Sequence, residues 1–146
     1  MYEWNDLKEE FEVDGSLRDI YIENITVNKW NQFLDYAKSS EYKLEFTHGD
    51  QSIEIPQTLK SIKELQETEP TTLFIWLNEN IQLHCHFFIE TEIELDLSPY
   101  DIRSEKDFRV LLAFIEDLAQ ALENRVIVTH EGMQEQVILS SDSKLV

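Results

Sequence analysis

The sequence has few of the residues from which common ligand-binding motifs are built. Only three of its 146 residues are glycine, namely Gly15, Gly49 and Gly132. Isolated glycines cannot form a phosphate-binding loop, so the dinucleotide and nucleoside-triphosphate fingerprints are both excluded. The single cysteine, Cys85, excludes an internal disulfide and a zinc site with several cysteine ligands. One unpaired thiol is also typical of a protein in a reducing cytosol.

Long apolar runs are missing as well. No stretch approaches the roughly 18 consecutive apolar residues that a membrane span requires. The chain begins MYEWND, which carries acids where a signal peptide needs bases followed by an apolar run. We therefore expect a cytoplasmic protein without a membrane partner.

Basic residues are scarce, because 12 Lys and Arg stand against 30 Asp and Glu, which gives a formal net charge of −18. Nucleic acid and anionic lipid would repel such a chain, so neither is expected as a direct partner. The composition is nevertheless 42% hydrophobic and 11% aromatic, too much apolar material for a disordered acidic chain. No linker or repeat divides the sequence, and one folded domain spanning residues 1–146 is expected.

Hydropathy patterning predicts short strands mixed with helices. Helices are expected over 4–11, 26–37, 58–65 and 104–122, and strands over 18–25, 42–46, 53–55, 72–77, 81–88, 92–97, 125–129 and 137–139. The last of these helices should begin after Ser104 and end with Asn124 in the left-handed conformation. Hairpins without regular β-α-β alternation indicate an α+β fold, with a mainly antiparallel sheet and helices packed on one face.

The segment between Lys63 and Arg103 contains no basic residue. It holds nine acids: Glu64, Glu67, Glu69, Glu79, Glu90, Glu92, Glu94, Asp96 and Asp101. It also contains three of the expected strands, and alternation assigns their residues to two faces. One face receives Leu73, Ile75, Leu77, Ile81, Leu83, Cys85, Phe87, Ile93, Leu95 and Leu97. The other receives Phe74, Trp76, Gln82, His84, His86, Phe88, Glu92, Glu94 and Asp96.

The second of these faces is the candidate binding surface. Uncompensated carboxylates steer a cationic partner, and a well-packed aromatic anchor contributes about 2 kcal/mol or more to binding. The residues predicted to contact a basic protein are Trp76, Glu90, Glu92, Glu94 and Asp96, with Asp101 at the rim. Two other interpretations compete with this one. The acidity can serve solubility alone, and a sheet covered on both faces would make Trp76 an ordinary core residue.

His84 and His86 allow a second hypothesis, a small metal-binding domain or metal-dependent enzyme. Residues two apart in a strand point the same way, so the two imidazoles could share zinc or non-haem iron, with Glu92 or Glu94 as a third ligand. The competing interpretation places both histidines on a half-exposed face beside carboxylates. Since no nucleophile or oxyanion motif is present, we expect neither enzymatic activity nor a cofactor. A third hypothesis is a regulatory module whose aromatic sheet face forms a homodimer.

Three segments carry a resemblance to a known class of protein: GSLRDIYIEN at 15–24, IQLHCHFFIETEIELDL at 81–97 and LLAFIEDLAQALENRVIVTHEG at 111–132. Together with the size, acidity and order of elements, they resemble the small acidic immunity proteins of bacterial polymorphic-toxin systems. The resemblance implies a non-enzymatic role, namely tight binding to a cognate basic toxin of nuclease type, which blocks the toxin's active site inside the producing cell. It assigns no individual functional residues.

Overall fold

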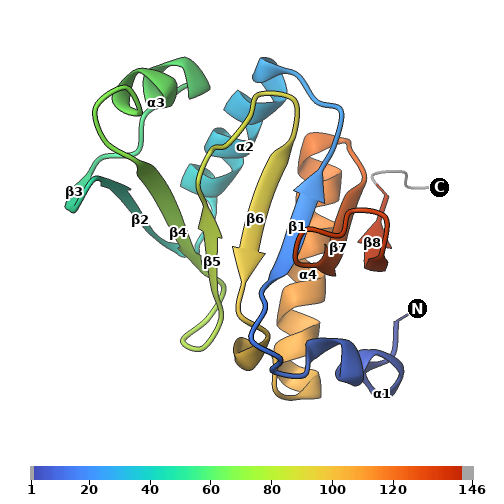
Figure 1. Cartoon of the computed structure of the whole chain (residues 1–146). Helices are drawn as coiled ribbons and strands as arrows, with labels where there is room; N and C mark the ends of the chain where they lie inside the picture. Colours follow the sequence, from blue (N-terminus) through green and yellow to red (C-terminus); the bar gives the residue numbers. More distant parts are fainter. Residues whose placement is uncertain (1, 143–146) are drawn as a thin grey trace.

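The computed structural model describes residues 2–142. Its centre is a sheet of eight strands in the order β3-β2-β4-β5-β6-β1-β7-β8, and every described pair of neighbours is antiparallel (Figure 1). The strands are β1 (Arg18–Ile22), β2 (Lys43–His48), β3 (Gln51–Ile53), β4 (Thr71–Trp76), β5 (Gln82–Cys85), β6 (Ile93–Leu97), β7 (Val126–His130) and β8 (Val137–Ser141). The first strand of the chain therefore lies between two strands that come much later in the sequence.

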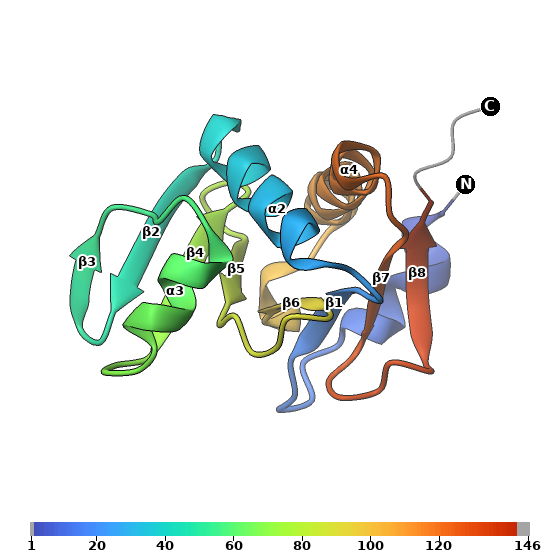
Figure 2. The same cartoon turned by 90° about the horizontal axis from the view of Figure 1, so that it is seen from above.

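The long helices lie together on one side of this sheet (Figure 2). The helical elements are α1 (Trp4–Leu7), η1 (Lys8–Phe11), α2 (Val27–Ser39), α3 (Leu59–Leu65), η2 (Pro99–Asp101) and α4 (Glu105–Leu122). The apolar stripes of α2 and α4 supply buried side chains such as Trp30, Phe33, Phe108 and Phe114 to the core. The predicted α+β fold, a single domain with helices on one face of an antiparallel sheet, is confirmed.

The helix starts predicted at Thr26, Thr58 and Ser104 are correct. The hydroxyls of Thr26, Thr58 and Ser104 each accept a hydrogen bond from the backbone N–H three residues later, which satisfies a free donor of the first turn. The predicted end of α4 at Leu122 is correct, but the left-handed residue after it was predicted one position too late. Glu123, not Asn124, adopts the left-handed conformation, with φ of 53°, and the N–H of Asn124 then closes the turn on the carbonyl of Ala119.

Two strands are shorter than predicted, and in both the chain turns through a positive φ. The strand expected over 18–25 ends at Ile22, and Asn24 follows with φ of 56°. The strand expected over 81–88 ends at Cys85, because Phe87 adopts φ of 59° and cannot continue the pleat. Alternation still holds across the turn at Phe87. All ten side chains assigned to the core face are buried, from Leu73 to Leu97.

Arg18 is the most deeply buried basic residue among those that the structure describes, with 1% of its surface exposed. Its guanidinium donates to the backbone carbonyls of Glu10, Glu12 and Leu17 and forms an ion pair with Asp14. A buried guanidinium requires such partners, since charge without them is costly in the interior. Arg18 therefore fastens the segment after η1 to the start of β1.

Candidate functional site

The second face of the sheet carries no long helix, and Figure 1 views the molecule from this side. Strand register aligns its side chains in rows across the sheet. One row runs Glu45, Phe74, His84, Asp96, Asp19 and Thr129. We call this surface the open face, and we define it by Lys43, Glu45, Phe74, Trp76, Gln82, His84, His86, Glu94, Asp96, Asp19 and Tyr21. The predicted assignment of the central residues to a face without helices is therefore correct.

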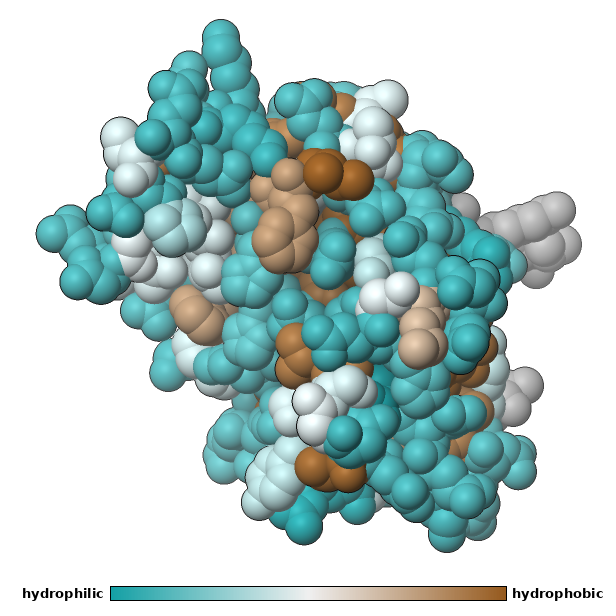
Figure 3. All heavy atoms as spheres, viewed as in Figure 1, coloured by the Kyte–Doolittle hydropathy of each residue, from teal (hydrophilic) through white to brown (hydrophobic). Residues whose placement is uncertain are grey.

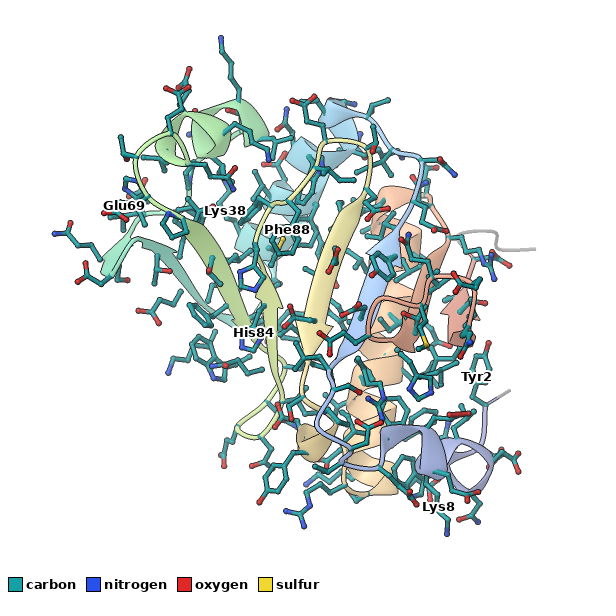
Figure 4. All side chains as sticks on the ribbon, in the orientation of Figure 1. Tyr2, Lys8, Lys38, Glu69, His84 and Phe88 are labelled. Carbon is teal, nitrogen blue, oxygen red and sulfur yellow. The ribbon has the colours of Figure 1, made fainter. Side chains whose placement is uncertain are left out.

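The part of the open face formed by β4 and β5 carries aromatic rings. The rings of Phe74 and Trp76 stack with centroids 6.0 Å apart, and the ring of His84, labelled in Figure 4, meets Phe74 edge-on at 5.4 Å. Trp76 is half-buried and borders a shallow hollow of about 390 Å³. The ammonium of Lys43 lies 4.7 Å from the centre of the Trp76 ring, a cation–π contact. Although the segment between Lys63 and Arg103 contains no basic residue, the open face does contain one, because β2 brings Lys43 to it.

Asp96, at the centre of the face, is a buried carboxylate held by two histidines. One oxygen lies 2.8 Å from Nδ1 of His84, and the other lies 3.5 Å from Nε2 of His86. Burial alone would raise the pKa of Asp96, but the hydrogen bonds and charges of the two imidazoles outweigh burial and lower it to about 2. The same hydrogen bond raises the pKa of His86. The contact between Asp96 and His86 thus favours the ionised carboxylate and the cationic imidazole.

Next to this group, β6 and β1 bring further carboxylates close together. Glu94 has its pKa raised to about 7, first by burial and then by the negative charges of Asp19, Glu92 and Asp96. Burial also raises the pKa of Asp19, whose carboxylate accepts hydrogen bonds from the N–H of Gly132 and the hydroxyl of Tyr21. Burial and mutual repulsion therefore both disfavour the ionised form of Glu94.

The connection between β7 and β8 covers one side of the open face (Figure 1). The amide of Gln134 donates to the carboxylates of Glu23 and Glu92, at 2.7 and 3.1 Å. The N–H of Gly132 reaches Asp19, and the carboxylate of Glu131 accepts from the N–H of Leu17. This cover explains why Asp19 and Tyr21 are buried, and it limits the accessible surface to β2, β4, β5 and β6.

The structure places four of the six predicted contact residues on or next to the open face, with Trp76 on β4 separated from the three acids by β5. Trp76, Glu94 and Asp96 point from the strands to the open face, and Glu92 lies just before β6 under the amide of Gln134.

The other two predicted residues lie at opposite ends of β6. Glu90 is exposed in the connection between β5 and β6, where its carbonyl accepts from the indole of Trp30. Asp101 lies in η2, where its carboxylate accepts from the N–H of Gln82 and where burial raises its pKa. Both residues border the face rather than form part of it.

The sequence patterns did not predict that the connection between β5 and β6 exposes two adjacent apolar side chains. Phe88 is 57% exposed and Ile89 is 48% exposed. Figure 3 shows apolar atoms at the upper end of β5, where Figure 4 labels Phe88. Alternation assigned Phe88 to the open face but left Ile89 unassigned. The signal in the sequence was the run Phe87-Phe88-Ile89, three consecutive large apolar residues between two strands.

The geometry gives no support to a metal site at the two histidines. Within residues 2–142, no three His, Cys, Asp or Glu side chains are arranged to hold a metal ion. All four imidazole nitrogens of His84 and His86 already have partners, which are Asp96 for both rings, Gln82 and Thr72.

Cys85 is buried, and burial raises the pKa of its thiol. No helix in the described part of the chain is both long and apolar enough to cross a membrane.

The open face thus carries stacked rings on β4 and a cluster of carboxylates on β6, with the exposed Phe88 and Ile89 at one end. Comparison with known proteins gives no match to a family model, to a curated protein or to a solved structure.

Proposed function

We propose that this chain is a non-enzymatic binding protein that holds a basic protein against the open face of its sheet. The observation that supports the proposal most directly is the cluster of carboxylates on β6, which lies on the same face as the accessible rings of β4. Burial, together with the negative charges of Asp19, Glu92 and Asp96, raises the pKa of Glu94 to about 7. A lysine or arginine of a partner would stabilise the ionised carboxylates of this cluster.

Two physical effects would act together in such a complex. The net charge of −18 and the acids around β6 attract a cationic partner over long range and accelerate encounter. Half-buried Phe74 and Trp76 offer rigid aromatic surface, which is enriched among the residues that dominate binding energy. The cation–π contact of Lys43 with Trp76 is exposed on the same surface and can be exchanged for a cation of the partner.

The specific form of this proposal is an immunity protein that neutralises a cognate nuclease toxin in the cytoplasm of the producing cell. A nuclease binds phosphates with lysine and arginine, and the carboxylates of Glu92 and Glu94 would pair with those same cations. The binding protein would then occupy the place of nucleic acid. The size, acidity and segments that resemble immunity proteins support this form.

A charge-reversal experiment tests the proposal. The partner is first isolated by affinity capture at low salt from cells that encode the chain. The variant Glu92→Lys/Glu94→Lys should then bind it with an association rate about tenfold lower or more at low salt, and the difference should shrink as salt is raised.

The matched control is Asp35→Lys/Glu116→Lys. It makes the same change in net charge at exposed positions of α2 and α4, on the opposite side of the sheet. A small effect of the control beside a large effect of the open-face variant supports the proposed surface. Equal effects of the two variants, or none from either, would contradict it.

A further inference from the structure

The tip of the connection between β5 and β6 exposes two consecutive large apolar side chains, Phe88 and Ile89. No other two adjacent large apolar residues are both exposed in the part of the chain that the structure describes. Phe88 lies against the ring of His86, with centroids 5.3 Å apart, so the tip continues the open face at its upper end (Figure 4). We call Phe88 and Ile89 the apolar tip.

A left-handed residue directs the tip outward. Phe87 has φ of 59°, a conformation that is a clear outlier for a bulky side chain. Its ring is buried between Trp30 and Phe46, with centroids 5.4 and 6.0 Å away. An extended Phe87 would carry the chain onward in the pleat. The turn instead leaves Phe87 in the core and presents the next two side chains to solvent, and such outliers persist only where their surroundings hold them.

Side chains at the end of α3 bind the backbone of the tip. The ammonium of Lys63 donates to the carbonyls of Phe87 and Phe88, at 2.7 and 3.0 Å. The side-chain amide of Gln66, one turn further along the helix, donates to the carbonyls of His86 and Phe87, each at 3.1 Å.

A third contact comes from α2. The indole N–H of Trp30 donates to the carbonyl of Glu90 at 3.1 Å. Three side chains from two helices thus bind the carbonyls of four of the five residues from 86 to 90. A surface loop held in this way is ordered before any partner arrives, which removes much of the entropic cost of binding.

We propose that the apolar tip is the anchor by which the basic partner is held, and that it inserts into an apolar pocket of that partner rimmed by lysine or arginine. This inference rests on the proposed function, because it names a contact within the same complex. Charge complementarity favours such a pocket, since exposed Glu90 follows the tip directly and Glu92 lies two residues further on. The carboxylates would pair with the rim while the apolar side chains fill the centre.

The first experiment places the photo-reactive residue p-benzoylphenylalanine at position 88 in cells that encode the chain. A control variant carries it at position 13, where Val13 is 66% exposed. We expect a basic protein to be cross-linked from position 88 and not from position 13. Capture of acidic proteins only, or of nothing from either position, would overturn the anchor, whereas the proposed function is tested separately by the charge-reversal variant.

The second experiment measures the affinity of the basic protein recovered in this way. Phe88→Ser/Ile89→Ser should raise Kd about 30-fold or more, as expected for central anchor residues, whereas Val13→Ser should leave Kd within about twofold. If the charge-reversal variant weakens binding while Phe88→Ser/Ile89→Ser does not, the anchor is refuted and the proposed function stands.

A third variant tests the support of the tip without altering its apolar side chains. Lys63→Met removes the ammonium that holds two carbonyls, and it should raise Kd about three- to tenfold and accelerate amide hydrogen exchange at residues 87–90. The control Lys60→Met removes the same charge from an exposed position of α3. Equal effects of the two variants on Kd would show that charge, rather than preorganisation, is responsible.

Discussion

The stability of the protein should depend on pH through Glu94, and the variant Glu94→Gln should remove that dependence. The pKa of Glu94 rises from 4.5 to about 7 in the folded chain, because burial and the charges of Asp19, Glu92 and Asp96 disfavour the carboxylate. A glutamine of nearly the same shape carries no charge at any pH. The substitution therefore relieves the repulsion without opening a cavity.

The sign of the effect follows from the direction of the pKa shift. A group whose pKa is higher in the folded state than in the unfolded state binds its proton more tightly when folded. Its contribution to stability is fully present below pH 4.5, declines between pH 4.5 and 7, and is lost above pH 7. Wild type should therefore be destabilised relative to Glu94→Gln at pH 8 and should match it at pH 4.5.

The magnitude can be bounded from the same shift. Each pKa unit corresponds to about 1.4 kcal/mol, which gives roughly 3 kcal/mol for a fully buried group. Glu94 is only half-buried, and solvent screens its interactions, so we expect a gain of about 1–2 kcal/mol at pH 8. For a chain of this length that gain raises Tm by about 3–7 °C.

Urea denaturation of both proteins at pH 4.5, 6 and 8 measures the difference directly. Glu116→Gln removes an exposed carboxylate of α4 and serves as the control, with an expected change below about 0.5 kcal/mol at each pH. If the difference in stability between Glu94→Gln and wild type were no larger at pH 8 than at pH 4.5, or if the variant were less stable than wild type at pH 8, the folded state would not disfavour the Glu94 carboxylate. The account of the acidic cluster would then be wrong.

Two further predictions concern groups that the fold buries. Arg18→Met should lower the free energy of unfolding by about 3 kcal/mol, because it leaves the carbonyls of Glu10 and Glu12 without their donor. The control Arg125→Met, at an exposed position, should lower it by less than about 0.5 kcal/mol, and similar losses for the two variants in urea denaturation would refute the argument. Buried Cys85, whose pKa is raised by burial, should react with an aromatic disulfide reagent only as fast as the chain unfolds, so a rate unaffected by low urea would show an accessible thiol.

Local patterns predicted the elements of this fold well because their causes are local. The alternation of Leu73, Ile75, Leu83 and their neighbours depends only on the pleat of each strand, so it identified the core face before the strand order was known. The hydroxyl of Thr26 caps a helix through a donor three residues away. Features of this kind require no knowledge of the rest of the chain.

The features that shape the candidate site depend instead on residues distant in sequence. Strand β1 inserts between β6 and β7, which brings Asp19 beside Asp96 and raises the pKa of Glu94. Lys43 reaches Trp76 only because β2 pairs with β4. No periodicity in the segment from 63 to 103 encodes either contact, so a face read from that segment alone looked more uniformly acidic and wider than it is.

The left-handed conformation of Phe87 is a second feature that local sequence patterns do not predict. Taken locally, an aromatic residue in a run of alternating side chains favours a continued strand, and that prediction placed residues 86–88 in β5. The conformation is determined instead by Trp30 and Phe46 around its ring and by Lys63 on its carbonyl, none of which is a sequence neighbour. An unfavourable backbone conformation, held by contacts from three elements, thus leaves two large apolar side chains exposed.

The acidic cluster around Glu94 also supports the proposed binding surface, because repulsion between its carboxylates lowers the stability of the free protein. Glu94 retains a proton near pH 7 although a lysine or arginine of this chain at the neighbouring position would remove the repulsion, and Lys43, the lysine that β2 brings to the face, contacts Trp76 instead. In the proposed complex, a cation of the partner would lower the pKa of Glu94 and release its proton, so the repulsion that weakens the free protein would be converted into affinity. A surface that served solubility alone would gain nothing from holding carboxylates close enough to suppress their ionisation, since separated charges keep a protein soluble at lower cost.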